Sequence, residues 1–233
     1  MENAGNHLLN YKYIFECSNG FQKIFEVKIH KDTLLLENPP AENLPEWTKL
    51  KNFKCPNCPL NESEHEYCPV AINLNRIIFF FQDVPSFQKV KITVVSPERN
   101  YVKSADVQTG VSSLLGLTMA SSGCPIVGKL KSLVKFHLPF ATIEETEIKI
   151  FSMYLLYQYF IMKKGEEPDW EMKKLNELYN DIMILNKNVA EKIAEVENKD
   201  ASINAVVVLN NFADSVTFGL DMDALEHLEK LFV

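Results

Sequence analysis

Four of the five cysteines in this chain are each followed directly by proline, and they come from widely separated parts of the sequence. They are Cys55 and Cys58 in the run FKCPNCPL, Cys68 in YCPVA and Cys124 in SSGCP, whereas Cys17 is followed by serine. A following proline has a fixed φ angle and disfavours helical geometry at the cysteine, so each sulfur projects from extended backbone. The shared context predicts that these four thiols, and not Cys17, form one site.

A metal site explains this pattern best. Two cysteines separated by two residues bring two thiolates onto one cation, and Cys68 and Cys124 would complete the four ligands of a tetrahedral structural zinc site. An iron–sulfur cluster is the alternative, because Cys-Pro also ends the bacterial ferredoxin run. The spacing departs from that run, with nine residues between Cys58 and Cys68 and fifty-five more before Cys124. A third possibility is that these are small buried thiols without metal.

Two histidines near the cysteines could each replace one of them as a ligand. His137 in FHLPF follows Cys124, and its apolar neighbours favour a hydrogen-bonded core histidine over a ligand. His65 in ESEHEY has the polar setting of a solvated loop residue. We therefore keep His137 as the substitute ligand.

The balance of charged residues excludes some classes of binding partner. The chain has 233 residues with 24 Lys and Arg against 31 Asp and Glu, a net charge of −7, which argues against nucleic acid or an anionic membrane as a partner. The N-terminal residues lack the charged, apolar and small-residue regions of a secretory signal. We expect a soluble, cytoplasmic protein, in which thiols stay reduced and spaced cysteines indicate metal or redox chemistry. Its partner would be a protein or a small molecule, and its oligomeric state is left open.

Residues 1–103 are predicted to form an α+β unit that contains the cysteine-rich loop. Two runs rich in aromatic and β-branched residues, 11–17 and 21–29, flank Ser18-Asn19-Gly20, which is typical of a tight antiparallel hairpin. A short third run covers 33–37, a helix is expected after Pro69, and residues 89–95 alternate as a half-buried strand. The fold class is therefore α+β, with a small antiparallel sheet and one helix.

Residues 104–233 are predicted to form a helical bundle that packs against this unit as one continuous body. Thr142 and Glu145 have the spacing of a capping box and open a helix that ends at Gly165. Its segment 148–162 is apolar on nearly every face, so we expect it to be the buried axis, with Phe151, Leu155 and Phe160 in the core. We expect further helices over residues 107–122, 169–198, 201–218 and 221–232.

Enzymatic signatures are weak. The run CPNC has the form of a thiol oxidoreductase motif, but its flanks make a poor strand and a poor helix. No Gly-rich phosphate loop, Ser/His/Asp signature or deaminase zinc motif is present. Catalysis is therefore not predicted, and two functional classes remain: a zinc-stabilised binding or regulatory module, or an iron–sulfur redox protein.

The motifs CPNCPL and YCPVA, the run from SSGCP to FHLPFATIEET, and the runs MYLLYQYF and DASINAVVVLNNF together resemble a family of uncharacterised bacterial proteins. The similarity spans nearly the whole chain. It implies a bacterial, soluble protein and transfers no catalytic residue, because the family has no established activity.

Overall fold

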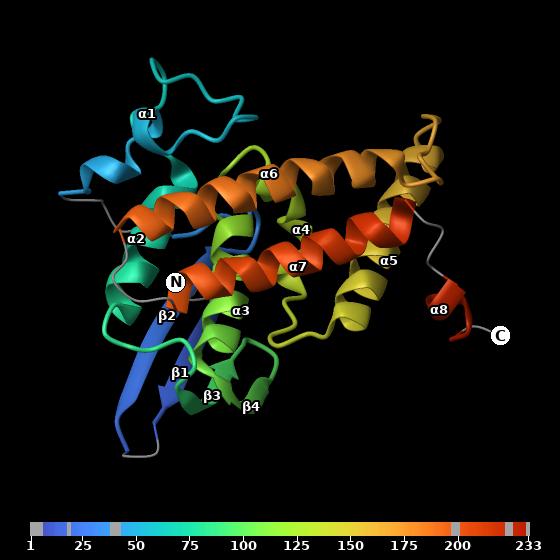
Figure 1. The fold of residues 1–233 in the computed structure, drawn as a ribbon. Helices are drawn as coiled ribbons and strands as arrows, with labels where there is room; N and C mark the ends of the chain where they lie inside the picture. Colours follow the sequence, from blue (N-terminus) through green and yellow to red (C-terminus); the bar gives the residue numbers. More distant parts are fainter. Residues whose placement is uncertain (1–6, 18–19, 38–42, 197–200, 222–225, 232–233) are drawn as a thin grey trace, which may run out of the picture.

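The computed structural model describes residues 7–17, 20–37, 43–196, 201–221 and 226–231. It has the predicted α+β architecture, in which an N-terminal antiparallel sheet is followed by a mainly helical C-terminal half (Figure 1). The sheet comprises β1 (Leu8–Glu16), β2 (Gln22–His30), β3 (Lys89–Val95) and β4 (Asn100–Asp106), in the order β2-β1-β3-β4.

The predicted hairpin is confirmed as the antiparallel pair β1 and β2, whose register places Glu16 opposite Gln22. Gly20 has the positive φ angle of 82° that a tight turn requires, while Ser18 and Asn19 lie outside the described residues. The run 33–37 is not a strand, since only Leu36 forms a bridge, to Ile29. The edge strand β4 was not predicted, because the sequence NYVKSAD has too little apolar alternation to mark a strand.

The helical elements are α1 (Leu50–Phe53), α2 (Pro69–Phe81), α3 (Val107–Ala120), α4 (Ser132–Lys135), α5 (Ile143–Lys163), α6 (Lys173–Val196), α7 (Ala201–Asp221) and α8 (Glu226–Glu229), with the 3-10 turns η1 (Glu46–Thr48) and η2 (Val127–Leu130). Helices α2, α3, α5, α6, α7 and α8 follow the predicted order, whereas α1, α4 and the two 3-10 turns were not predicted. The capping box of Thr142 and Glu145 is formed in both directions, through bonds of 3.2 and 2.8 Å. The run AVVVL is helical and lies in α7.

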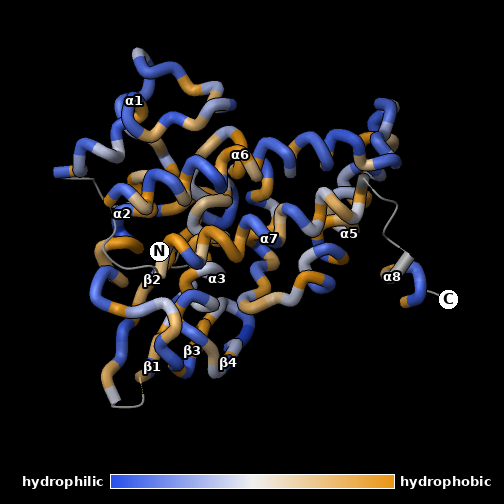
Figure 2. The backbone as a smooth tube through the Cα atoms, viewed as in Figure 1, coloured by the Kyte–Doolittle hydropathy of each residue, from blue (hydrophilic) through white to orange (hydrophobic). Residues whose placement is uncertain are grey.

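The core lies between the sheet and the helices packed on one of its faces. Alternate residues of the strands, such as Tyr13, Phe15 and Ile92, are fully buried on that face. Helix α2 reaches the sheet through rings of Phe81 and Phe80, and α3 packs directly on β1 and β3. Helices α6 and α7 run side by side as an outer layer (Figure 1), and α6 is hydrophilic over much of its length, as a surface helix should be (Figure 2).

The prediction that α5 is the buried axis is wrong. Only the first half of its length packs well: Phe151 is buried, Leu155 is partly buried, and Phe160 is 52% exposed. Helix α3 occupies the central position instead, between the sheet and α7. An apolar helix is buried only where neighbouring elements are long enough to cover it, and its own sequence does not determine their length. Here α7 covers only one side of α5.

Strand β4 runs directly into α3, because Asp106 ends the strand and Val107 begins the helix. A boundary between residues 103 and 104 would therefore cut through β4. The stretch Ala201–Leu220 of α7 has the length and apolar character to cross a membrane, a property that core helices of folded proteins share. In this structure α7 packs against both α3 and α6.

Candidate metal centre

The first two cysteines of the motif lie in a loop whose two ends are joined by the backbone. Lys49 and Tyr67 form an antiparallel bridge. On either side of it, the Leu50 amide donates to the Glu66 carbonyl and the Cys68 amide donates to the Thr48 carbonyl, both at 2.9 Å. The loop between these ends, residues 50–66, is therefore closed at its base, next to Cys68.

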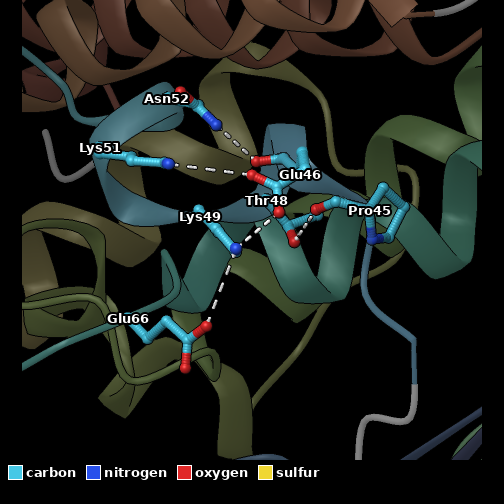
Figure 3. Close-up of polar contacts among 7 residues, drawn as sticks. All are labelled: Pro45, Glu46, Thr48, Lys49, Lys51, Asn52 and Glu66. Carbon is cyan, nitrogen blue, oxygen red and sulfur yellow. Dashed lines mark hydrogen bonds and ion pairs between the residues drawn. The ribbon is translucent and has the colours of Figure 1, made fainter.

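Polar side chains reinforce this base (Figure 3). The Lys49 ammonium lies 2.5 Å from the Glu46 carboxylate and 4.0 Å from that of Glu66. The hydrogen bond with Lys49 holds the pKa of Glu46 below its usual value. The Asn52 amide donates to the Glu46 carbonyl at 2.7 Å, which ties α1 to η1. The base thus has a defined geometry before any metal is considered.

Two asparagines attach the loop to α6. The amide nitrogen of Asn57 donates to both the carbonyl and the carboxylate of Asp181 at 3.0 Å. The amide nitrogen of Asn188 donates to the Phe53 carbonyl at 3.3 Å and to the Cys55 sulfur at 3.4 Å. Sequence reasoning missed this attachment. Asn57 stands within the CPNC motif, but nothing in the α6 sequence marks Asn188 as a partner.

Cys68 and Cys124 repeat one local geometry. Each precedes a proline and begins a helical turn, in which its carbonyl accepts a bond from the amide four residues later, at 3.1 Å for Cys68 and 2.9 Å for Cys124. Burial raises the pKa of Cys68 to about 11, although hydrogen bonds from the amides of Ala71 and Val70 to its sulfur oppose the shift. Burial also raises the pKa of Cys124, opposed in the same way by two backbone amides.

The amides that donate to the Cys124 sulfur belong to Ile126 and Val127. In both cases, therefore, the proline removes the first amide after the cysteine and the next two point at the sulfur. Amide donors of this kind stabilise a thiolate and are the usual outer partners of metal-bound cysteine.

The four thiols from three segments of the chain lie close enough to interact electrostatically. The pKa of Cys55 is raised to about 12, first by burial and then by neighbouring thiols. Those neighbours are, in decreasing order of effect, Cys68, Cys124 and Cys58. All four are free thiols. Because their pKa values are raised, the thiols of Cys55, Cys68 and Cys124 are protonated at neutral pH in the absence of a cation.

The sulfurs are neighbours without being gathered around one point. Over the described residues, no group of three or more His, Cys, Asp and Glu side chains is arranged to hold a metal ion. Cys17 lies elsewhere, at the end of the first hairpin strand, where its sulfur accepts a hydrogen bond from Gln88 at 3.2 Å. His65 is exposed in the loop.

The substitute ligand His137 has different neighbours. Its Nε2 atom lies 2.7 Å from the Tyr13 hydroxyl and 3.3 Å from that of Ser113. Burial, and then the charge of Lys149, lowers the pKa of His137 to about 3, so the imidazole is neutral. It does not figure among the groups that shift the pKa values of Cys55, Cys68 or Cys124.

The fold and the site define an α+β protein with three buried free thiols and one half-buried one, Cys58, in a closed loop, at the start of α2 and after the end of α3. Residues 9–233 match the family described as Domain of unknown function (DUF6901), and the chain belongs to that family. No curated protein and no solved structure matches the chain significantly.

Proposed function

We propose that this protein is a metal-stabilised binding module in which Cys55, Cys58, Cys68 and Cys124 hold one structural zinc ion. The observation that carries the proposal is that thiols from three chain segments lie close enough to interact: Cys58 helps to raise the pKa values of the other three, and Cys68 and Cys124 help to raise that of Cys55. Four thiolates are the ligand set of a closed structural zinc site. Such an ion would connect the closed loop to the ends of α2 and α3.

The donors around the sulfurs fit a thiolate site. Backbone amides point at two of the sulfurs and the Asn188 amide at a third, so the groups that stabilise negative charge on sulfur are already in position. The sulfurs have to move closer together to reach the zinc–sulfur distance of about 2.3 Å. Because the thiols of Cys55, Cys68 and Cys124 are protonated, binding also has to displace their protons.

An iron–sulfur cluster on the same cysteines is the alternative function. The amide donors to Cys68 and Cys124 favour it as much as they favour zinc, because hydrogen bonds to sulfur also tune cluster potentials. The irregular spacing of the cysteines and the requirement for cluster assembly make zinc the better candidate.

Elemental analysis combined with an absorption spectrum of anaerobically purified protein tests the proposal. We expect a colourless protein with one zinc per chain, and chelation of that zinc should lower the melting temperature. A brown protein with a band near roughly 400 nm, together with iron and acid-labile sulfide, would establish the cluster instead. Protein that takes up neither zinc nor iron when both are supplied would leave the cysteines as buried thiols without metal.

A further inference from the structure

A second candidate site lies in the helical half. A cavity of about 270 Å³ opens between α3, α4 and the loop that follows it, α5, α6 and α7. Most of the lining side chains are apolar, among them Leu117, Val134, Ile150, Ile182 and Leu209. None of the four cysteines of the proposed zinc site lines it, although the substitute ligand His137 does. An apolar cavity with a few polar groups is the usual form of a small-molecule site.

The polar groups in the wall are linked to one another. The neutral imidazole of His137 lies within hydrogen-bonding distance of the hydroxyls of Tyr13 and Ser113, which are themselves 3.1 Å apart. Lys149 is beside His137, since its charge contributes to the lowered pKa of that imidazole. His137, Ser113 and Lys149 all line the cavity. They give its apolar interior one polar wall.

Among the described residues, Lys149 forms no ion pair with a carboxylate. Its ammonium donates to the carbonyl of Leu133 at 3.2 Å and to that of Phe136 at 2.5 Å. An ammonium group has three donors, so one remains after these two bonds. Burial lowers the pKa of Lys149 to about 8, which leaves it mainly charged at neutral pH. A half-buried positive charge in apolar surroundings favours a negative partner.

The balance of charge around the cavity points the same way. Lys149 and Lys103 both line it, and none of the described lining residues is Asp or Glu. This contrasts with the chain as a whole, whose net charge is −7. Among the described residues of this lining, Lys103 and Lys149 are the charged side chains. The cavity is therefore positive and apolar in a protein that is otherwise acidic.

The volume limits the size of a ligand. An apolar cavity of about 150 Å³ is large enough for benzene, and most drug-sized ligands occupy about 300–1,000 Å³. A cavity of about 270 Å³ is therefore suited to a molecule of roughly ten non-hydrogen atoms.

We propose, as a specific form of the binding role put forward above, that this cavity binds a small monocarboxylate with an apolar aliphatic or aromatic body. The apolar part occupies the space lined by α3, α6 and α7, and the carboxylate pairs with the ammonium of Lys149. The hydroxyl of Ser113 and the imidazole of His137 supply further hydrogen-bonding groups at the same wall. Lys103, exposed at β4, adds positive charge to the cavity lining.

Octanoate and 1-octanol are matched probes, because both are unbranched molecules of about nine or ten non-hydrogen atoms and only octanoate is charged. With the full-length protein, calorimetry at pH 7 should show octanoate binding at least about tenfold more tightly than 1-octanol. Octanoate should also raise the melting temperature. Equal affinity for the two probes, or no detectable binding of octanoate, would overturn the proposal.

Substitutions assign the effect to the cavity. Lys149→Met should abolish the preference for octanoate, whereas Lys135→Met, which removes an exposed lysine of α4 outside the lining, should leave it unchanged. If Lys149→Met does not fold, Lys103→Met should reduce the preference, because Lys103 is exposed and its loss does not disturb the core. A preference unchanged by Lys149→Met or by Lys103→Met would place octanoate elsewhere.

Metal content measured on the same samples separates the two proposals. Octanoate binding by protein that holds no metal would leave the cavity proposal standing and remove the zinc proposal. Zinc in protein that ignores octanoate would do the reverse.

Discussion

The side-chain amide of Asn188, in the middle of α6, donates to the sulfur of Cys55 across 3.4 Å and to the Phe53 carbonyl across 3.3 Å. This one residue joins the cysteine loop to the helical half. Because a hydrogen bond contributes about 0.5–1.5 kcal/mol, Asn188→Ala should lower the free energy of unfolding by about 1–2 kcal/mol. Asn180→Ala, which removes an exposed asparagine of the same helix, is the matched control in denaturant unfolding. Equal effects of the two would show that the attachment has no energetic weight.

Serine replacements test which cysteines belong to the proposed zinc site. Each of Cys55→Ser, Cys58→Ser, Cys68→Ser and Cys124→Ser should reduce bound zinc and the melting temperature, because metal binding is coupled to folding. Cys17→Ser should leave the zinc content unchanged, since Cys17 interacts with Gln88 in another part of the molecule. Full zinc occupancy in Cys124→Ser would remove that residue from the site. Loss of zinc in His137→Ala would make the histidine the fourth ligand.

Zinc uptake should release protons. The pKa values of Cys55 and Cys68 are raised to about 12 and 11, and that of Cys124 is also raised, so these thiols are protonated at pH 7 without metal. Zinc binds thiolates, so we expect at least three protons per zinc, measured with a pH indicator in weak buffer. Affinity should fall as the pH is lowered, because protons compete for sulfur. Release of fewer than two protons would contradict the four-thiolate site.

Because His137 is neutral in the folded protein, the free energy of unfolding should depend on pH in the acidic range. Its pKa is lowered from 6.5 to about 3 in the folded protein, so below pH 6.5 the unfolded chain binds a proton that the folded chain does not. The stabilisation is therefore complete above pH 6.5 and is lost as the pH falls toward 3. At pH 5 the loss should reach about 2 kcal/mol.

His137→Gln is the matched variant for this effect, since glutamine keeps a hydrogen-bonding group near Tyr13 and Ser113 but does not titrate. Urea unfolding at pH 7 and pH 5 should show a smaller difference between the two pH values in the variant than in the parent protein. An unchanged difference would assign the acid sensitivity to other groups.

Gly110 allows α3 to approach the sheet closely. A Cβ atom at this position would lie 2.4 Å from the Phe15 ring and 2.9 Å from Ile92, both of which are buried. Gly110→Ala should therefore destabilise the fold by about 1–3 kcal/mol, more than the helix gains from alanine. Gly116→Ala in the same helix meets only Leu209, at 3.3 Å, and is the control. A stabilised Gly110→Ala protein, by thermal unfolding, would show that the helix can move away from the sheet.

The sequence predicted those elements whose signals are local. The pairing of β1 with β2, the beginning of α2 at Pro69 and the capping box of Thr142 with Glu145 all depend on residues within a few positions of one another. The helix expected over 169–198 is likewise found as α6, in which Leu175 and Val189 are buried. The shared Cys-Pro context is also a local signal, and the single site of four thiols that it indicates stays a prediction.

The tertiary structure decided which elements cover one another. Segment 148–162 of α5 is apolar on nearly every face, yet Phe160 is exposed because no described residue covers its side chain, and the central place belongs to α3. Strand β4 forms by pairing with β3, although its own side chains carry little pattern. The attachment of Asn188 to Cys55 and the positive cavity at Lys149 also depend on the tertiary structure. Each joins residues far apart in the chain, and only packing sets the distances on which hydrogen bonds and electrostatic interactions depend.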